Sequence, residues 1–360
     1  PFAQQLGATP LLIGLAVGMY SFSNTFGNLL AGIWTDKTGA KRVLYVGLGV
    51  TGIVLILHVF IQTPTQLVLA RFAHGFTAGF AVPAAFTYLS HQSKQAKHGK
   101  SMALSGAVVG VAAVIGPAFG GVMTASAGIK WVFLITGILM LIAAILALFL
   151  PQPTVSKKLD SVDTGRSMFA LLKDIPLFYS YFGSFALMFA QGVLAYMLPL
   201  TVEVLNYGND VSGLLLSTFA FTAILIFILP TNRLYDRFAH ENTLTVGLFI
   251  LGFGMFLLSL TSQLPLLYGA IVIYGIGFAF IFPSLNALIA QHTNSSDRGK
   301  AFGLFYAFFS LGVVVGSTVI GAFEVSANGA FVIGAMVVFI SSIILILLIQ
   351  RQKKTNRTIT

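Results

Sequence analysis

Long runs of apolar residues, separated by short polar stretches, make up most of the chain. Eleven runs are about 20 residues long, which is enough for a helix to cross a bilayer. They cover about residues 11–34, 42–61, 66–90, 101–125, 130–150, 176–202, 211–232, 243–261, 264–290, 301–323 and 329–350. Because hydrocarbon offers no water to free backbone groups, each run is predicted to be a membrane-spanning helix.

The chain also repeats itself at an offset of 200 residues. Positions Asp36, Gly47, Gly52, Gly75, Phe80, Pro83, Lys100, Gly116 and Gly121 recur as Asp236, Gly247, Gly252, Gly275, Phe280, Pro283, Lys300, Gly316 and Gly321. A duplication of this length inside a hydrophobic chain is typical of secondary transporters, which bind substrate between the copies. We therefore expect an all-α polytopic membrane protein with two pseudo-symmetric six-helix lobes.

A polar break divides the two copies. The predicted domains are an N-terminal lobe at 1–150 with five helices, a cytoplasmic linker at 151–174, a C-terminal lobe at 175–350 with six helices, and a basic cytoplasmic tail at 351–360. A short surface helix is expected near Ser167–Leu172 of the linker. The span Ile175–Val202 has no counterpart in the first copy, so we expect 11 of 12 transmembrane helices, with the first absent.

Charge is scarce and one-sided. Only 8% of residues are charged and 57% are hydrophobic, whereas a soluble domain is about a quarter charged. If the segment after the first span is cytoplasmic, 18 of the 20 Lys and Arg fall on the inner side, Lys130 falls outside and Arg71 lies within a span. This bias predicts the orientation, with a cytoplasmic C-terminus. It also explains the net charge of +10 by topology and anionic-lipid contact, without nucleic acid.

Several classes of function are disfavoured by the composition. The chain has no cysteine, which excludes disulfides, thiolate metal sites and cysteine nucleophiles. No cluster of His, Asp, Glu or Ser suggests general acid–base or nucleophilic chemistry, so a membrane-embedded enzyme is a remote alternative. We expect no enzyme activity, no metal and no cofactor.

The segment after the first span carries the most specific motif. Its pattern, G-x-x-x-D-x-x-G-x-K-R, is formed by Gly32, Asp36, Gly39, Lys41 and Arg42. It resembles the signature gating loop of the major facilitator superfamily, and Asp236 with Arg237 marks a degraded second copy. An acidic side chain at such a place can bind cations or the positive end of a facing helix. The resemblance implies that Asp36 latches the lobes by meeting the start of the helix near Lys300; alternatively, Asp36 and Lys41 only mark topology.

Arg71 is the one ionised side chain well inside a predicted span. A cation in hydrocarbon is costly, so it is expected to face the bundle interior and to have a partner. Its surroundings resemble the fourth-helix motif of the superfamily, in which the arginine is associated with proton coupling. Snorkelling to the interface is the alternative. No carboxylate lies deep in a span, so the proton acceptor is assigned to the missing helix, to Glu203 or to Glu324.

Glycines crowd the 101–125 span. They and one proline form a pattern at Gly106, Gly110, Gly116, Pro117, Gly120 and Gly121. Small residues permit close helix packing and a proline promotes a kink. The pattern resembles the antiporter motif of drug-exporting members of the superfamily, although ordinary tight packing would explain the glycines alone.

Aromatic and polar residues in other spans are candidates for an adaptable substrate cavity. The candidates are Asn24, Phe185, Met188, Gln191, Phe305 and Tyr306. Lipid-facing or core packing is the commoner role of any one aromatic residue, and Asn24 also suits helix–helix hydrogen bonding.

Together these features resemble the twelve-spanning drug:proton antiporter branch, the multidrug efflux pumps of the superfamily. The resemblance implies a proton-coupled exporter of small lipophilic or drug-like compounds that works by alternating access. The alternative is a superfamily transporter of a sugar or other metabolite. Expected partners are a small-molecule substrate, protons and the lipid bilayer, in a multi-pass protein of the cell membrane that functions as a monomer.

Overall fold

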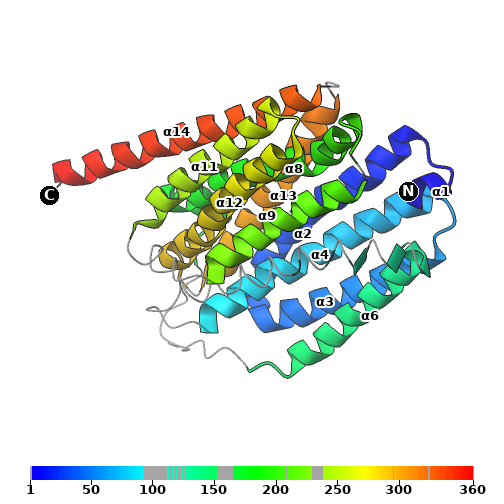
Figure 1. Cartoon of the computed structure of the whole chain (residues 1–360). Coiled ribbons are helices and arrows are strands. Elements are labelled where there is room, and N and C mark those ends of the chain that lie inside the picture. The colour runs from blue at the N-terminus through cyan, green and yellow to red at the C-terminus, as the bar shows by residue number, and fades with distance from the viewer. Residues whose placement is uncertain are drawn as a thin grey trace. The chain divides into compact units, whose positions relative to one another are not determined.

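The computed structural model describes residues 2–92, 127–151, 165–207, 209–228, 238–294, 296–322 and 325–359, together with positions 112, 116, 119, 120, 123 and 124. All regular structure in these ranges is helical (Figure 1). The chain divides into two compact units, which are described separately. Unit 1 comprises Pro1–Ala96, Ala118–Asp174 and His292–Leu311, and unit 2 comprises Lys97–Pro117, Ile175–Gln291 and Gly312–Thr360.

Unit 1 is built from the helices of the first copy. They are α1 (Phe2–Gln5), α2 (Pro10–Thr38), α3 (Ala40–Leu57) with the 3-10 turn η1 (His58–Phe60), α4 (Pro64–Gln92), α6 (Ile129–Leu148) and α7 (Met168–Lys173). Helix α4 packs against both α2 and α3, and α6 covers α3 (Figure 1). The core includes Ala31, Val43, Leu44, Phe80 and Ala84, which come from three helices.

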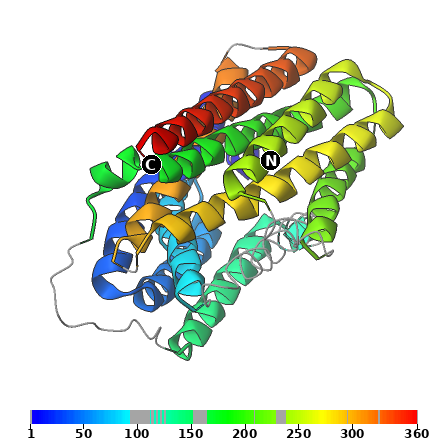
Figure 2. The ribbon, with the colours of Figure 1, turned by 90° about the vertical axis from the view of Figure 1, so that its left-hand side faces the viewer.

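Unit 2 is built mainly from the second copy. Its helices are α8 (Ile175–Val204), α9 (Asn209–Ile228), α11 (His240–Leu260), α12 (Leu264–His292) and α14 (Ala327–Ile359). Helix α14 packs against α8 and α11, as the rotated view also shows (Figure 2). Helix α13 (Arg298–Ala322) contributes Arg298–Leu311 to unit 1 and Gly312–Ala322 to unit 2.

The predicted membrane helices agree with the structure where it describes them. Within the described ranges, eight helices are long and apolar enough to cross a membrane, and the apolar stretch Val211–Phe227 is shorter. The all-helical polytopic fold predicted from the hydrophobic pattern is confirmed. The linker helix is also confirmed as α7, which Ser167 caps by accepting a hydrogen bond from the Ala170 N–H. The predicted span 101–125 lies mostly outside the described residues.

Two boundaries differ from the sequence prediction. The motif expected as a loop after residue 34 is helical up to Thr38, and Gly39 alone separates α2 from α3. Gly39 has a φ of 91°, in the region that favours glycine, so the chain can turn within one residue. At the other end, the basic tail continues α14 to Ile359, because Lys, Arg and Gln are good helix formers.

The 200-residue repeat is visible in the helices and their packing. Helices α4 and α12 begin at residues 64 and 264 and end at 92 and 292. A Cβ added to Gly47 would lie 2.9 Å from the Cβ of Phe80, and a Cβ added to Gly247 would lie 3.0 Å from the Cβ of Phe280. Each copy therefore uses the same glycine to let one helix approach an aromatic residue of the next.

This packing predicts that Gly47→Ala destabilises the protein. The new methyl group would overlap Phe80 and approach the Ala81 nitrogen at 3.3 Å, and overpacking of this kind costs about 1–3 kcal/mol. Gly49→Ala is the matched control on the same helix, because its Cβ would meet only Ala144, at an ordinary 3.7 Å. Thermal unfolding in detergent should place Gly47→Ala below Gly49→Ala. Equal melting temperatures would contradict the packing.

Candidate functional site

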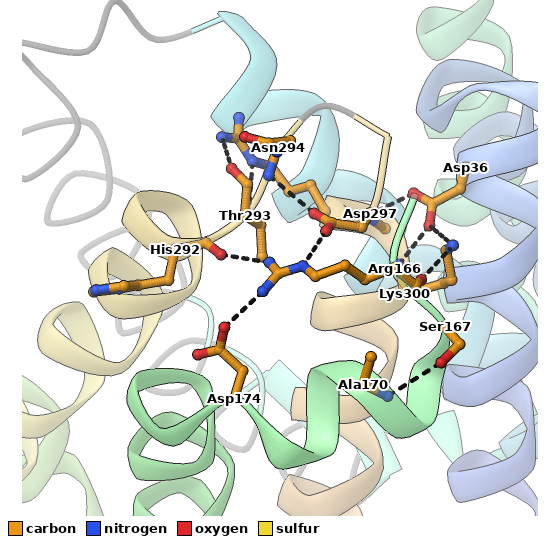
Figure 3. A network of polar contacts seen from close by, with 12 residues as sticks. Asp36, Arg166, Ser167, Ala170, Asp174, His292, Thr293, Asn294, Asp297 and Lys300 are labelled. Atoms are coloured by element: carbon orange, nitrogen blue, oxygen red, sulfur yellow. Dashed lines mark hydrogen bonds and ion pairs between the residues drawn. The ribbon is translucent and has the colours of Figure 1, made fainter. Parts of the chain in front are cut away.

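The carboxylate of Asp36, near the end of α2, binds the first turn of α13 (Figure 3). Its Oδ1 accepts a hydrogen bond from the Gly299 N–H at 2.7 Å, and its Oδ2 accepts one from the Lys300 N–H at 2.9 Å. The first N–H groups of a helix have no partner within the helix and carry partial positive charge. Asp36 therefore acts as a helix cap that is supplied from a different helix.

Glycines make this contact possible. A Cβ at Gly299 would collide with Oδ1 of Asp36. A Cβ at Gly32 would lie 2.7 Å from the Gly299 oxygen, and a Cβ at Gly303 would lie 2.7 Å from the Asn28 oxygen. The backbones of α2 and α13 thus touch over about one helical turn, which only residues without a side chain permit.

Burial controls the charge of Asp36, which lies beyond the predicted membrane span. Removal from water raises the pKa of Asp36 to about 6, although the N–H groups of Lys300 and Gly299 and the Lys300 charge act in the opposite direction. The Lys300 Nζ lies 4.0 Å from Oδ2. A carboxyl with this pKa changes its charge near neutral pH.

The linker meets the same end of α13 through Arg166. Its Nε donates to Oδ2 of Asp297, its Nη1 to Oδ2 of Asp174 and its Nη2 to the His292 oxygen, each at 2.6 Å (Figure 3). Burial alone would lower the pKa of Arg166, but the bonds to Asp297 and Asp174 outweigh that effect and leave the pKa raised. Arg166 therefore stays charged and joins Asp174, at the end of α7, to the turn before α13.

Lys300 joins the linker contacts to the Asp36 contact. Its Nζ donates to the backbone oxygen of Arg166 at 2.9 Å, while its own N–H binds Asp36. Asp297 accepts a hydrogen bond from the Asn294 N–H at 2.9 Å, which stabilises the turn before the helix. The result is one polar network in which the end of α2, the linker and the start of α13 share partners.

A second polar network lies deeper along α2. The Asn24 Nδ2 donates to the Gly75 oxygen at 3.0 Å, and its Oδ1 accepts from the Asn28 Nδ2 at 2.9 Å and from the Ser310 hydroxyl at 2.7 Å. Asn28 also donates to the Tyr306 oxygen at 2.9 Å. The Asn24 amide, a predicted cavity residue, thus makes hydrogen bonds between helices in unit 1.

Arg71 lies on α4 and has two partners on α2. Its Nε donates to the Ala16 oxygen at 3.1 Å, and its guanidinium carbon lies 4.5 Å from the centre of the Tyr20 ring. The cation therefore turns toward the bundle, as expected for a charge within a span.

The other predicted cavity residues lie in both units. Within unit 1, Phe305 and Tyr306 are buried on α13, and the centres of the Tyr306 and Phe86 rings lie 5.6 Å apart. Within unit 2, Gln191 accepts a hydrogen bond from the Tyr274 hydroxyl at 3.0 Å. In the same unit, Phe185 and Met188 of α8 contact Gly312 of α13.

A separate apolar groove of about 430 Å³ lies on α2, α3 and α4 of unit 1. It is lined by Trp34, Thr38, Arg42, Val43, Val46, Gly47, Val50, Phe76, Thr77 and Phe80. Of the predicted site residues only Arg42 lines it, and none of the cavity candidates does. Lys41 and Arg42 lie in the first turn of α3, which begins at Ala40 after Gly39.

Some predicted residues contribute nothing to the described sites. Glu203 is exposed at the end of α8. An added Cβ at Gly116 or Gly120 meets no described atom within 4 Å. The predicted residues Asp236, Arg237, Glu324, Gly106, Gly110, Pro117 and Gly121 lie outside the described residues. The described part of the chain holds no group of three or more His, Asp or Glu that suits a metal ion.

Sequence reasoning missed several residues of these networks. Asn28 had a local signal, since it lies one helical turn after Asn24 on the same face. Arg166, Asp297 and Ser310 had none, because their partners lie far away in the chain. Arg166 and Asp297, for example, are 131 residues apart.

Comparison with known proteins identifies the family. The chain matches the Major Facilitator Superfamily over residues 1–212 and 180–360. It is 26% identical over 330 residues to an MFS-type transporter of Methanocaldococcus jannaschii, covering 89% of this chain and 84% of that protein. It is 29% identical over 310 residues to the multi-drug resistance efflux pump PmrA of Streptococcus pneumoniae, covering 84% and 77%.

The fold has a solved counterpart as well. The human organic anion transporter MFSD10 superposes with a TM-score of 0.78 at 17% identity, over 96% of this chain and 87% of that one. The family match extends over the whole chain, and the helical fold agrees with it. The chain therefore belongs to the major facilitator superfamily and is a multi-pass membrane transporter of small molecules rather than an enzyme.

Proposed function

We propose that the chain is a proton-coupled secondary transporter that exports small lipophilic or drug-like compounds by alternating access. The similarity to an efflux pump over 84% of the chain supports the substrate class. The observation that carries the mechanism is the bond between Asp36 and the first turn of α13.

The Asp36 contact has the properties of a gate. It joins two helices by two charge-assisted hydrogen bonds, which are strong but can be exchanged for bonds to water. Glycine-lined helix surfaces around it have no interlocking side chains, so they can separate without repacking. In the proposed cycle the two lobes rock about a central site, and this contact forms and breaks on the cytoplasmic side.

The linker network strengthens the same gate. Arg166 binds Asp297 and Asp174, and Lys300 binds both Arg166 and Asp36. Opening at Asp36 would therefore disturb the linker as well. The proposed orientation places this network and the C-terminus in the cytoplasm of a cell-membrane protein, which we propose works as a monomer.

Transport by the purified protein tests the proposal directly. Proteoliposomes with an imposed pH gradient should accumulate ethidium, a lipophilic cationic dye, and a protonophore should abolish the accumulation. Empty liposomes under the same gradient provide the control. Gradient-driven movement of a sugar or other polar metabolite, without any movement of ethidium, would favour the metabolite alternative and contradict drug export.

The gating role predicts that Asp36→Asn opens the contact. The amide turns an NH₂ group toward one of the two N–H donors. Unlike either oxygen of a carboxyl group, an NH₂ group cannot accept a hydrogen bond, so one buried N–H is left unsatisfied at a cost of about 1–3 kcal/mol. The open population should rise roughly ten- to a hundredfold. Thr35→Cys is a suitable reporter, because Thr35 is only 3% exposed and the natural chain has no cysteine.

A membrane-permeable maleimide should label Thr35→Cys faster in the Asp36→Asn background. The matched control is the double variant of Thr35→Cys and Lys37→Gln, with Asp36 unchanged. It removes a neighbouring charge on an exposed residue. Equal labelling rates in the two variants would argue against a latch at Asp36.

The contact should also depend on pH. Asp36 has a pKa of about 6 in the contact and a usual value of 3.8, so the contact binds a proton more tightly than the released state does. Linkage then makes the contact strongest below the lower value and weaker as pH rises through about 6.

Maleimide labelling of Thr35→Cys should therefore accelerate between pH 5 and 7, relative to the exposed reporter Lys37→Cys at each pH. The acceleration should disappear in Asp36→Asn, which does not titrate. A pH profile that is the same with Asp36 and with Asn at this position would show that Asp36 is not the titrating group.

A further inference from the structure

Two histidines form a buried cluster with Arg71. His58 belongs to η1, Arg71 and His74 to α4, and Tyr20 to α2. The His74 ring lies 5.0 Å from the Tyr20 ring and 5.5 Å from the His58 ring, centre to centre. Arg71 joins this group through its contact with the Tyr20 ring. Four polar side chains thus meet inside the bundle of unit 1.

Each histidine has one ring nitrogen without a partner in the described part of the chain. The Nδ1 of His58 lies 2.8 Å from the Val54 oxygen, so it carries the hydrogen and leaves Nε2 as a free acceptor. His58 Nε2 and His74 Nδ1 are both buried without a hydrogen bond. Such groups are costly unless something binds them.

No described residue printed in contact with the cluster is a carboxylate that would explain it as an ion pair. Among the described neighbours, α2 contributes Tyr20, α4 contributes Arg71, and α6 contributes the apolar ring of Phe133, 4.7 Å from His58. The carboxylate proposed as acceptor at Glu203 is exposed at a helix end. The buried bases of this region are therefore the imidazoles.

We propose that His58 and His74 form the proton-binding site of the transporter, a role that rests on the proposed proton-coupled export. An imidazole nitrogen takes a proton from water and becomes a cation, and the proton returns to water on the other side. Imidazole is suited to this exchange because a ring nitrogen can take up a proton and release it again without breaking any other bond.

Arg71 moves when a proton binds to one of the two rings. Its charge acts on both rings, so a second positive charge in the cluster repels it. Arg71 can respond by leaving the Ala16 oxygen and the Tyr20 ring, which hold it on α2. Protonation thereby weakens an α2–α4 contact. Because Gly75 and Gly79 also bring α4 against the α2 backbone, this shift acts on the helix that carries Asp36.

The position of the cluster suits proton entry from outside. His58 ends the helix that begins beside Asp36, and Arg71 lies seven residues after the start of α4. With the cytoplasmic side assigned from the basic residues, the cluster lies in the outer half of the span. An exporter driven by an inward proton gradient needs its acceptor to be reached from that side.

The experiment separates coupling from substrate movement. Proteoliposomes containing the double variant His58→Gln and His74→Gln are compared with wild type and with His240→Gln, a histidine at the start of α11. Gradient-driven ethidium accumulation should fall roughly tenfold, the scale of the coupling between two binding sites. Exchange of ethidium without a gradient should stay near the wild-type rate, since it needs no net proton transfer.

Retention of gradient-driven accumulation with the wild-type pH profile would overturn the proposal. If wild type itself moves no ethidium, export of drugs fails as a function, and the proton site is then judged separately by NMR of ¹⁵N-histidine protein. The chain has six histidines, so the single variants assign the two signals. Titration of at least one of these rings within the pH range over which the protein stays folded is expected, and titration of neither ring would overturn the site. If the double variant loses ethidium exchange as well, the NMR titration of the two histidines decides whether they bind protons.

Discussion

The constraint on which the described site depends is the burial of one carboxylate at the start of an apolar helix. Asp36 leaves water, and two backbone N–H groups of α13 replace its hydration. This exchange is possible only at a helix start, where N–H groups are free, and only where the neighbouring residue is glycine. A side chain at Gly299 would occupy the place of the carboxylate. The carboxylate cap therefore requires a residue without a side chain at position 299.

The same helix start serves several parts of the chain. Lys300 uses its N–H for Asp36 and its side chain for the linker backbone, while Asp297 receives the Arg166 guanidinium. These bonds share partners, and polar networks of this kind respond as a unit. The linker is thus more than a tether between two copies. Its Arg166 is held by three acceptors, among them Asp174 beside α8.

The two copies of the repeat keep their packing, while the polar sites described lie in unit 1. Gly47 and Gly247 serve the same purpose in α3 and α11, since a glycine that admits a neighbouring helix is needed wherever the helices are needed. The ionisable side chains of the histidine cluster are not repeated in the second copy. The Arg71, His58 and His74 cluster has no charged counterpart at the positions 200 residues later, which are Ile271, Leu258 and Tyr274. At these positions the two copies share the scaffold, and only the first copy carries the ionisable side chains.

The sequence by itself determined the helices, the duplication and the family, because a membrane span needs a long apolar run and the motif around Asp36 has a fixed spacing. It also selected Asp36 and Arg71 as special, since ionised groups next to or within a span are costly. Only the tertiary structure decided their partners. Asp36 and Gly299 are 263 residues apart, and no local pattern marks Arg166 or pairs His58 with His74. Hydrophobic periodicity is a property of neighbours in the chain, whereas a hydrogen bond depends on atoms that only folding brings within reach.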